Sequence, residues 1–93
     1  MEGKKELLGI ACQGQLQVLL PESLRGATVR LTKLAMMESL PPESKEINLR
    51  DAEGRVVLVT GRHNGEWVYW AELVEVGGLI QTRMVQQLFD WPP

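Results

Sequence analysis

The sequence has little of what most enzymes and metal proteins use. Its 93 residues include one cysteine, Cys12, and one histidine, His63. A single cysteine excludes an intramolecular disulfide and is typical of a reducing compartment. A zinc site needs about four ligands, more than these two side chains supply. Cys12 lies in an apolar run and is expected to be a buried structural thiol.

Catalytic arrangements are also scarce. Glu72 and Glu75 are an odd number of positions apart in a predicted strand, so they should face opposite sides rather than form a carboxylate pair. Gly61 and Gly65 flank a predicted hairpin turn instead of a strand-to-helix junction, so they do not form a phosphate-binding loop. We therefore expect no enzyme, no cofactor and no metal site.

Long apolar runs and a basic excess are both missing. No segment approaches the ~18 apolar residues that cross a bilayer. The short apolar stretch after Lys4 and Lys5 is interrupted by Gly9, which argues against a signal peptide. We expect a cytoplasmic protein without a membrane partner. The net charge of −2 and the pI of about 5.4 argue against a general nucleic-acid coat protein, since such proteins are usually basic.

The charges are unevenly distributed. Arg83 is the single basic residue after His63, whereas the middle of the chain is rich in basic residues. These are Arg25, Arg30, Lys33, Lys45, Arg50, Arg55 and Arg62. The pattern allows a local basic surface on an acidic protein, and it equally fits an ordinary mixed surface.

Length and pattern predict one mainly β domain over residues 1–93. A chain of this size buries roughly 60–65% of its unfolded surface, enough for one core. Apolar alternation predicts strands over residues 7–12, 15–20, 27–35, 45–50, 55–63 and 66–76. Residues 79–89 switch to helical spacing. We expect a small curved antiparallel barrel of five to six strands with a C-terminal amphipathic helix.

Turn residues set the expected register. Gln13-Gly14 and Asn64-Gly65 predict two-residue hairpin loops, and the segment from Asp51 to Gly54 predicts a type I turn. Leu49 then lies opposite Val56, Ile47 opposite Leu58, Val59 opposite Trp70 and Leu58 opposite Ala71. One face becomes a core of Ile47, Leu49, Val56, Leu58, Tyr69, Ala71 and Leu73. The other is a mixed face of Asn48, Arg50, Arg55, Val57, Val59, Trp70 and Glu72.

Three alternatives stay open for this mixed face. It can bind a base or sugar ring on Trp70 with an anion beside it. The C-terminal helix can instead cover it and bury Trp70, or the face can mediate self-association. A bulged turn at His63-Asn64-Gly65 would shift the register by one, placing Trp67 and Tyr69 on the mixed face and Trp70 in the core.

The segment from Ile47 to Glu75 reads IxLxDxxGxxVxVxGxxxGxWVYWAxLVE and resembles the strand core of small OB-fold domains. The resemblance implies a five-stranded curved barrel that binds oligonucleotides, oligosaccharides or proteins on one face. It assigns the ligand-binding role to Asn48, Arg50, Arg55, Val57 and Trp70. Such barrels carry a helix between their third and fourth strands, whereas the predicted helix here comes last. An SH3-like barrel therefore also remains open.

Two functions follow from these observations. The first is a non-enzymatic binding module that holds single-stranded nucleic acid or another extended ligand on the mixed face. The second is a structural or protein-interaction domain that forms a homo-oligomer through an apolar face. They differ in salt dependence, because phosphate contacts weaken steeply as ionic strength rises.

Overall fold

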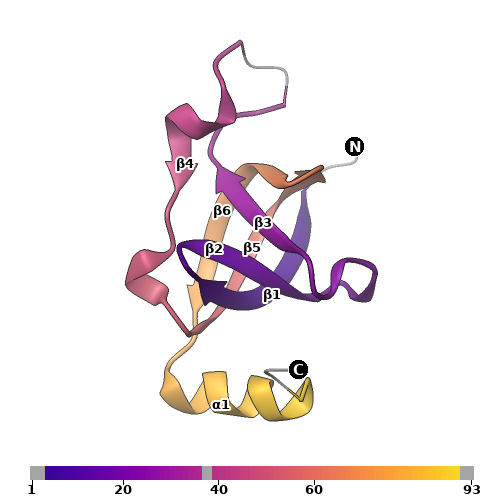
Figure 1. Cartoon of the computed structure of the whole chain (residues 1–93), viewed down its shortest axis with the longest axis vertical. Helices are drawn as coiled ribbons and strands as arrows, with labels where there is room; N and C mark the ends of the chain where they lie inside the picture. Colours follow the sequence, from indigo (N-terminus) through magenta and orange to yellow (C-terminus); the bar gives the residue numbers. More distant parts are fainter. Residues whose placement is uncertain (1–3, 37–38, 91–93) are drawn as a thin grey trace.

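The chain is mainly β and ends in a helix (Figure 1). The computed structural model describes residues 4–36 and 39–90. In these ranges the strands are β1 (Lys5–Cys12), β2 (Gln15–Leu20), β3 (Thr28–Thr32), β4 (Glu46–Ile47), β5 (Val56–Asn64) and β6 (Trp67–Val76), and the helix is α1 (Leu79–Leu88). The expectations of a mainly β fold, of five to six strands and of a C-terminal helix are confirmed.

Hydrogen bonds run in a ring through five of the strands. β1 pairs with both β2 and β5, β5 pairs with β6, β6 with β3, and β3 returns to β2. β4 pairs with β3 outside this ring. All pairings are antiparallel except that between β3 and β6, which is parallel. The sheet is therefore mixed, and the expectation of a purely antiparallel sheet is wrong at this one junction.

The hairpin between β1 and β2 follows directly from the sequence. Gln13 and Gly14 both take positive φ angles, of 56° and 81°. A two-residue turn of this kind matches the right-handed twist of the strands beside it, and glycine adopts it without steric cost. Cys12 accordingly pairs with Gln15, as the turn residues predict.

The strand predicted over residues 45–50 is much shorter and has a different neighbour. Only Glu46 and Ile47 are extended, and they pair with β3. A 3-10 turn follows over Arg50–Ala52. β1 occupies the side of β5 that was assigned to this segment. The predicted pairings of Leu49 with Val56 and of Ile47 with Leu58 are wrong, because alternation gives the buried face of a strand but not its neighbour.

The register between β5 and β6 also differs from the prediction. Asn64 pairs with Trp67, so the turn residues are Gly65 and Glu66 rather than Asn64 and Gly65. Gly65 has a φ of 67°, the conformation that a type II′ turn requires at this position. Two bulges further along the strands, between Thr60 and Arg62 and between Leu58 and Val59, shift the pairing again. Val59 lies opposite Leu73 and Leu58 opposite Glu75, not opposite Trp70 and Ala71.

This register reverses the expected sorting of β5. Val57 and Val59 are fully buried in the main core, whereas Leu58 is half-buried and lies outside it. The main core draws on every strand of the ring: Leu7, Ala11, Leu16, Val18, Val29, Leu31, Val57, Val59, Val68 and Ala71, with Leu49 and Ala52 from the crossing segment. A smaller cluster of Ile10, Leu19 and Val56 lies under α1.

Helix α1 is held to the ring by few contacts. Gly77 and Gly78 separate it from β6, and the Gln81 side chain accepts a hydrogen bond from the Gly78 amide at 2.8 Å. Val85 packs against the smaller cluster. Thr82 is 4% exposed, and its hydroxyl accepts the Val56 amide hydrogen bond at 3.0 Å.

The hydrogen bond from the Val56 amide to the Thr82 hydroxyl leads to a prediction about stability. Thr82→Val keeps the side-chain shape but leaves the buried Val56 amide without an acceptor, so the free energy of unfolding should fall by about 1–3 kcal/mol in a urea titration. Thr82→Ser keeps the acceptor and loses a methyl group, and should cost about 0.8 kcal/mol. Hydrogen exchange at the Val56 amide should accelerate in the valine variant alone. Equal losses of stability in both variants would contradict this account.

Candidate functional site

The five residues predicted to bind a ligand do not form one surface. The Asn48 side chain accepts the Arg50 amide hydrogen bond at 2.8 Å, and the Arg55 side chain donates to the Gly77 carbonyl at 2.8 Å. Val57 is buried at 0% exposure, so its placement on the mixed face is wrong. The residues that line the hollow around Trp70 include none of the other four.

Trp70 is exposed and held in an unusual backbone conformation. Its exposed fraction is 58%, and its φ is 58°, in the left-handed region that costs a bulky residue about 1–3 kcal/mol. The alternative in which α1 covers Trp70 is therefore wrong. So is the bulged-turn register that would have put Trp70 in the core.

A bulge in β6 produces this conformation. Arg62 pairs with Tyr69 and Thr60 with Glu72, so Gly61 faces two residues of β6. The Trp70 amide leaves the β5 ladder and donates to the Leu34 carbonyl at 2.7 Å. A side chain at Gly61 would collide with the Val68 side chain and the Tyr69 carbonyl. Bulges reorient a side chain in this way, and here the result is an indole directed to solvent.

A hollow of about 520 Å³ lies beside the Trp70 indole. Lys4, Lys33 and Glu72 supply its charges, and Ile47, Ala71 and Leu73 its apolar wall. The Lys4 ammonium lies 5.5 Å from the centre of the indole ring and 3.3 Å from a Glu72 carboxylate oxygen. Lys33 forms no ion pair with any described residue, so its charge is available to a ligand.

The other tryptophan that the structure describes, Trp67, is covered by side chains of the protein itself. Trp67 is 6% exposed. The Arg30 guanidinium lies over its indole, 4.4 Å from the centre of the indole ring. Arg30 binds both oxygens of Glu46, at 3.0 and 2.7 Å. The hydrogen bonds that the Arg30 guanidinium donates to the Glu46 carboxylate raise the pKa of Arg30 above its ordinary value. Arg30 thus joins β3, β4 and β6, and Trp67 is covered by it rather than free to bind a ligand.

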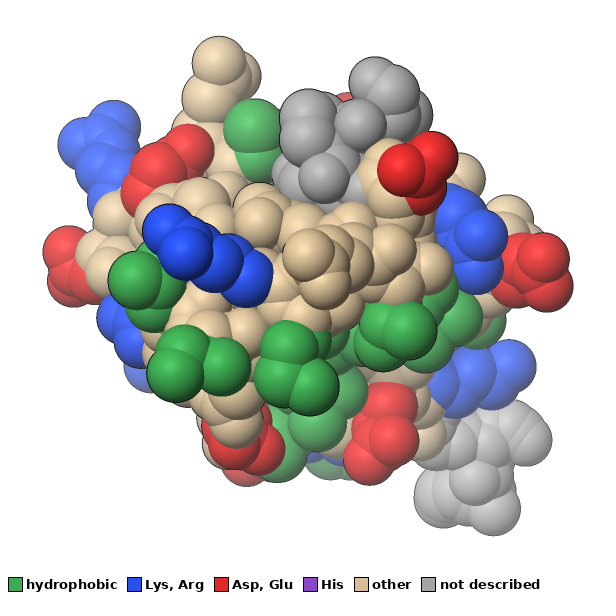
Figure 2. Space-filling model, turned by 90° about the horizontal axis from the view of Figure 1, so that it is seen from below, with side chains coloured by type: hydrophobic (Ala, Val, Ile, Leu, Met, Phe, Trp, Pro, Cys, Tyr) green, Lys and Arg blue, Asp and Glu red, His purple; other side chains and the backbone are tan. Residues whose placement is uncertain are grey.

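A separate apolar surface lies at the end of the molecule where α1 is found. Leu79, Ile80, Met84 and Leu88 are exposed by 67%, 75%, 59% and 78%, and Figure 2 shows hydrophobic side chains gathered in a band across this end. The helical spacing was correctly predicted, but the alternative in which this helix covers the mixed face is wrong, and its apolar side chains lie exposed. Each such side chain gains about 1.5–3 kcal/mol on full burial, so this exposure is costly in an isolated chain.

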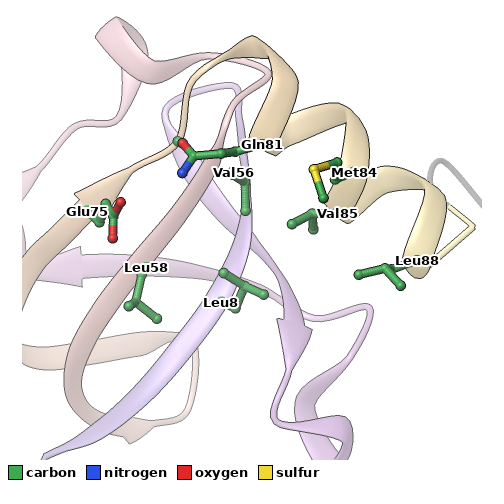
Figure 3. Close-up of a pocket in the computed structure, with 9 residues that line it drawn as sticks. Leu8, Val56, Leu58, Glu75, Gln81, Met84, Val85 and Leu88 are labelled. Atoms are coloured by element: carbon green, nitrogen blue, oxygen red, sulfur yellow. The ribbon is translucent and has the colours of Figure 1, made fainter.

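A hollow of about 310 Å³ adjoins this helix (Figure 3). Leu8, Val56 and Leu58 from the sheet line it together with Met84, Val85 and Leu88 from α1. Glu75 and Gln81 are the polar residues at its edge. The hollow forms because Leu58 points away from the main core. The predicted register placed Leu58 in the core, so the sequence analysis did not find this hollow.

The reactive side chains lie apart from both hollows. His63 is exposed next to the hairpin turn, and Cys12 is partly buried at the end of β1. Among the described residues, no group of three or more His, Cys, Asp or Glu side chains is placed to hold a metal ion. The helix in this part of the chain is too short to span a membrane.

Comparison of the chain with family models, with curated proteins and with solved structures finds no match.

The backbone at Trp70 yields a second prediction. Trp70→Gly should be more stable than Trp70→Ala by about 1 kcal/mol, because only glycine adopts the left-handed conformation without a steric penalty. At the neighbouring strand position the order should reverse: the free energy of unfolding of Tyr69→Ala should exceed that of Tyr69→Gly by about 0.5–1 kcal/mol. Urea unfolding of the four variants measures both differences. If Trp70→Ala is more stable than Trp70→Gly, as expected for alanine over glycine at Tyr69, then Trp70 has ordinary strand geometry in solution.

Proposed function

We propose that this chain is a non-enzymatic binding module, built on a small OB-like barrel, that binds single-stranded nucleic acid at Trp70. One base stacks on the indole, and the phosphate beside it is held by Lys33. The observation that carries the proposal is a tryptophan kept exposed in a costly backbone conformation next to lysine side chains.

The strand order supports the OB-like assignment. The ring contains five strands, and its third and fourth members in chain order are β3 and β5. The connection between them is long, as in OB barrels, although β4 and short 3-10 turns stand where those barrels carry a helix. β4 pairs with β3 rather than with β5, so the segment before β5 belongs to this long connection.

The shape and chemistry of the Trp70 hollow support the ligand class. An exposed indole face stacks any base, which is worth ~1–3 kcal/mol per base and does not depend on sequence. The Lys4 ammonium above the ring is partly neutralised by Glu72, whereas Lys33 is not neutralised by a described residue. A ligand with one flat ring and a nearby anion fits this arrangement.

The protein as a whole does not attract nucleic acid. Its net charge is −2, and the other predicted contacts, Arg50 and Arg55, line no part of the Trp70 hollow. Binding should therefore depend on a single stacked base and about one phosphate contact, giving a shallow salt dependence. The Trp70 hollow is lined by no histidine, cysteine or hydroxyl side chain, so we assign the module no catalytic step. The single cysteine leads us to assign it a cytoplasmic setting.

A titration with a short oligothymidylate at low salt tests this proposal. Tryptophan fluorescence should change on binding, and Trp70→Gly should weaken the affinity by roughly 5- to 150-fold, the equivalent of one lost stacked base. Lys33→Ala should weaken binding and lower the salt slope by about 0.7, the value for one phosphate of a single strand.

Lys45→Ala is the matched control for Lys33→Ala, because Lys45 is an exposed lysine on the neighbouring segment that does not line the hollow. It should leave both the affinity and the salt slope unchanged. A wild-type chain that shows no signal at about 1 mM oligonucleotide rules the proposal out. Equal effects of Lys33→Ala and Lys45→Ala would assign the binding to general charge rather than to this hollow.

A further inference from the structure

Helix α1 presents an apolar stripe and an apolar hollow side by side. Ile80, Met84 and Leu88 follow one another at intervals of four residues, and each is more than half exposed. In Figure 3 the hollow has α1 on one side and Leu58 with Glu75 on the other, with Leu8 between them. The surface thus carries both a row of projecting apolar side chains and an apolar hollow beside it.

We propose that this surface pairs with the same surface on a second copy of the chain. In a two-fold dimer each patch must be complementary to itself. The stripe of one α1 would enter the hollow of the other copy, and the second stripe would enter the first hollow in return. This pairing is separate from the Trp70 hollow and does not depend on the function proposed for it.

The helix geometry fixes the orientation of such a pair. Two antiparallel helices related by a two-fold axis near Met84 place Ile80 of each copy beside Leu88 of the other. Residues on a helix advance by about 100° each, so Arg83 points away from the side of α1 that carries Gln81 and Val85. That side borders the hollow of its own copy. Arg83 therefore faces the far edge of the hollow that its helix enters.

Charge at that far edge favours a second copy as the occupant. Glu75 stands there, and neither Glu75 nor Arg83 forms an ion pair with a residue that the structure describes. The dimer brings Arg83 of each copy to Glu75 of the other, twice by symmetry. Opposite charges in this arrangement select the partner and fix its register.

The remaining composition of α1 also distinguishes a second copy from a membrane surface. Arg83 is the one charged residue between Leu79 and Leu88, and the polar positions are Gln81, Thr82, Gln86 and Gln87. Helices that lie on membranes carry a face rich in lysine and arginine, which this helix lacks. An uncharged flank allows two copies of the same helix to approach without repulsion.

Sedimentation velocity of the full chain from about 1 μM to about 1 mM tests the dimer. The wild type should show a mass that rises with concentration from one chain to two. Ile80→Gln combined with Met84→Gln should remain monomeric over this range, since both side chains are exposed and the fold does not need them. Leu40→Gln is the matched control: Leu40 is equally apolar and 53% exposed, lies outside the α1 surface, and should leave the dimer intact. Circular dichroism establishes that all three chains are folded.

A charge exchange tests the orientation. Glu75→Arg and Arg83→Glu should each raise the dimer dissociation constant by at least about tenfold, because each places like charges together at two symmetric positions. The double variant restores opposite charges and should recover most of the wild-type affinity.

Four results would overturn the proposal. The first is a wild-type chain that stays monomeric throughout the concentration range. The second is such a monomer that binds a hydrophobic dye or lipid vesicles through α1, which would assign the surface to another partner. The third is a dimer that survives the combined Ile80→Gln and Met84→Gln changes, whatever the effect of Leu40→Gln. The fourth is a double charge variant no tighter than either single variant.

Discussion

The architecture depends on a short seam where β3 meets β6. Only two residue pairs, Arg30 with Trp67 and Leu31 with Val68, form the parallel ladder that closes the ring. Backbone bonds from Arg30 to Glu66 and from Trp70 to Leu34 extend it. The Arg30 guanidinium covers the Trp67 indole and binds Glu46, so one side chain joins β3, β4 and β6. Without this seam the strands would form an open sheet, and the core residues would lie on a solvent-exposed face.

The same seam explains the geometry of Trp70. β3 ends at Thr32, and the Trp70 amide makes the next backbone bond across the seam, to the Leu34 carbonyl. β6 bulges opposite Gly61 at the residue that makes this bond, and the Trp70 side chain is exposed there. The backbone cost at Trp70 is thus maintained by bonds on both sides of the residue, which is how strained residues persist at functional positions.

Sequence reasoning was accurate where the cause is local and failed where it is not. Gln13-Gly14 and Gly77-Gly78 mark real chain reversals and ends because glycine conformations are set within a few residues. The helical period of α1 was visible for the same reason. The neighbour of β5 and the two bulges in β6 depend on residues dozens of positions away, and no periodicity encodes them. The sequence left open whether Trp70 is exposed or buried under the helix, because this depends on where the helix packs. The lysines beside Trp70 come from the end of β3 and from the N-terminal segment, and alternation could not place them there.

The two irregularities in β6 have a consequence for how copies of this chain behave at high concentration. From Ala71 to Val76, β5 is the one strand among the described residues that pairs with β6, so its other edge is open. That edge carries Leu73 and Val74, both largely exposed. Bulges at Trp70 and Val74 interrupt it, and Glu72 and Glu75 add like charges. A strand with such breaks cannot continue a regular cross-β stack, so an apolar open edge is tolerated here without seeding fibrils.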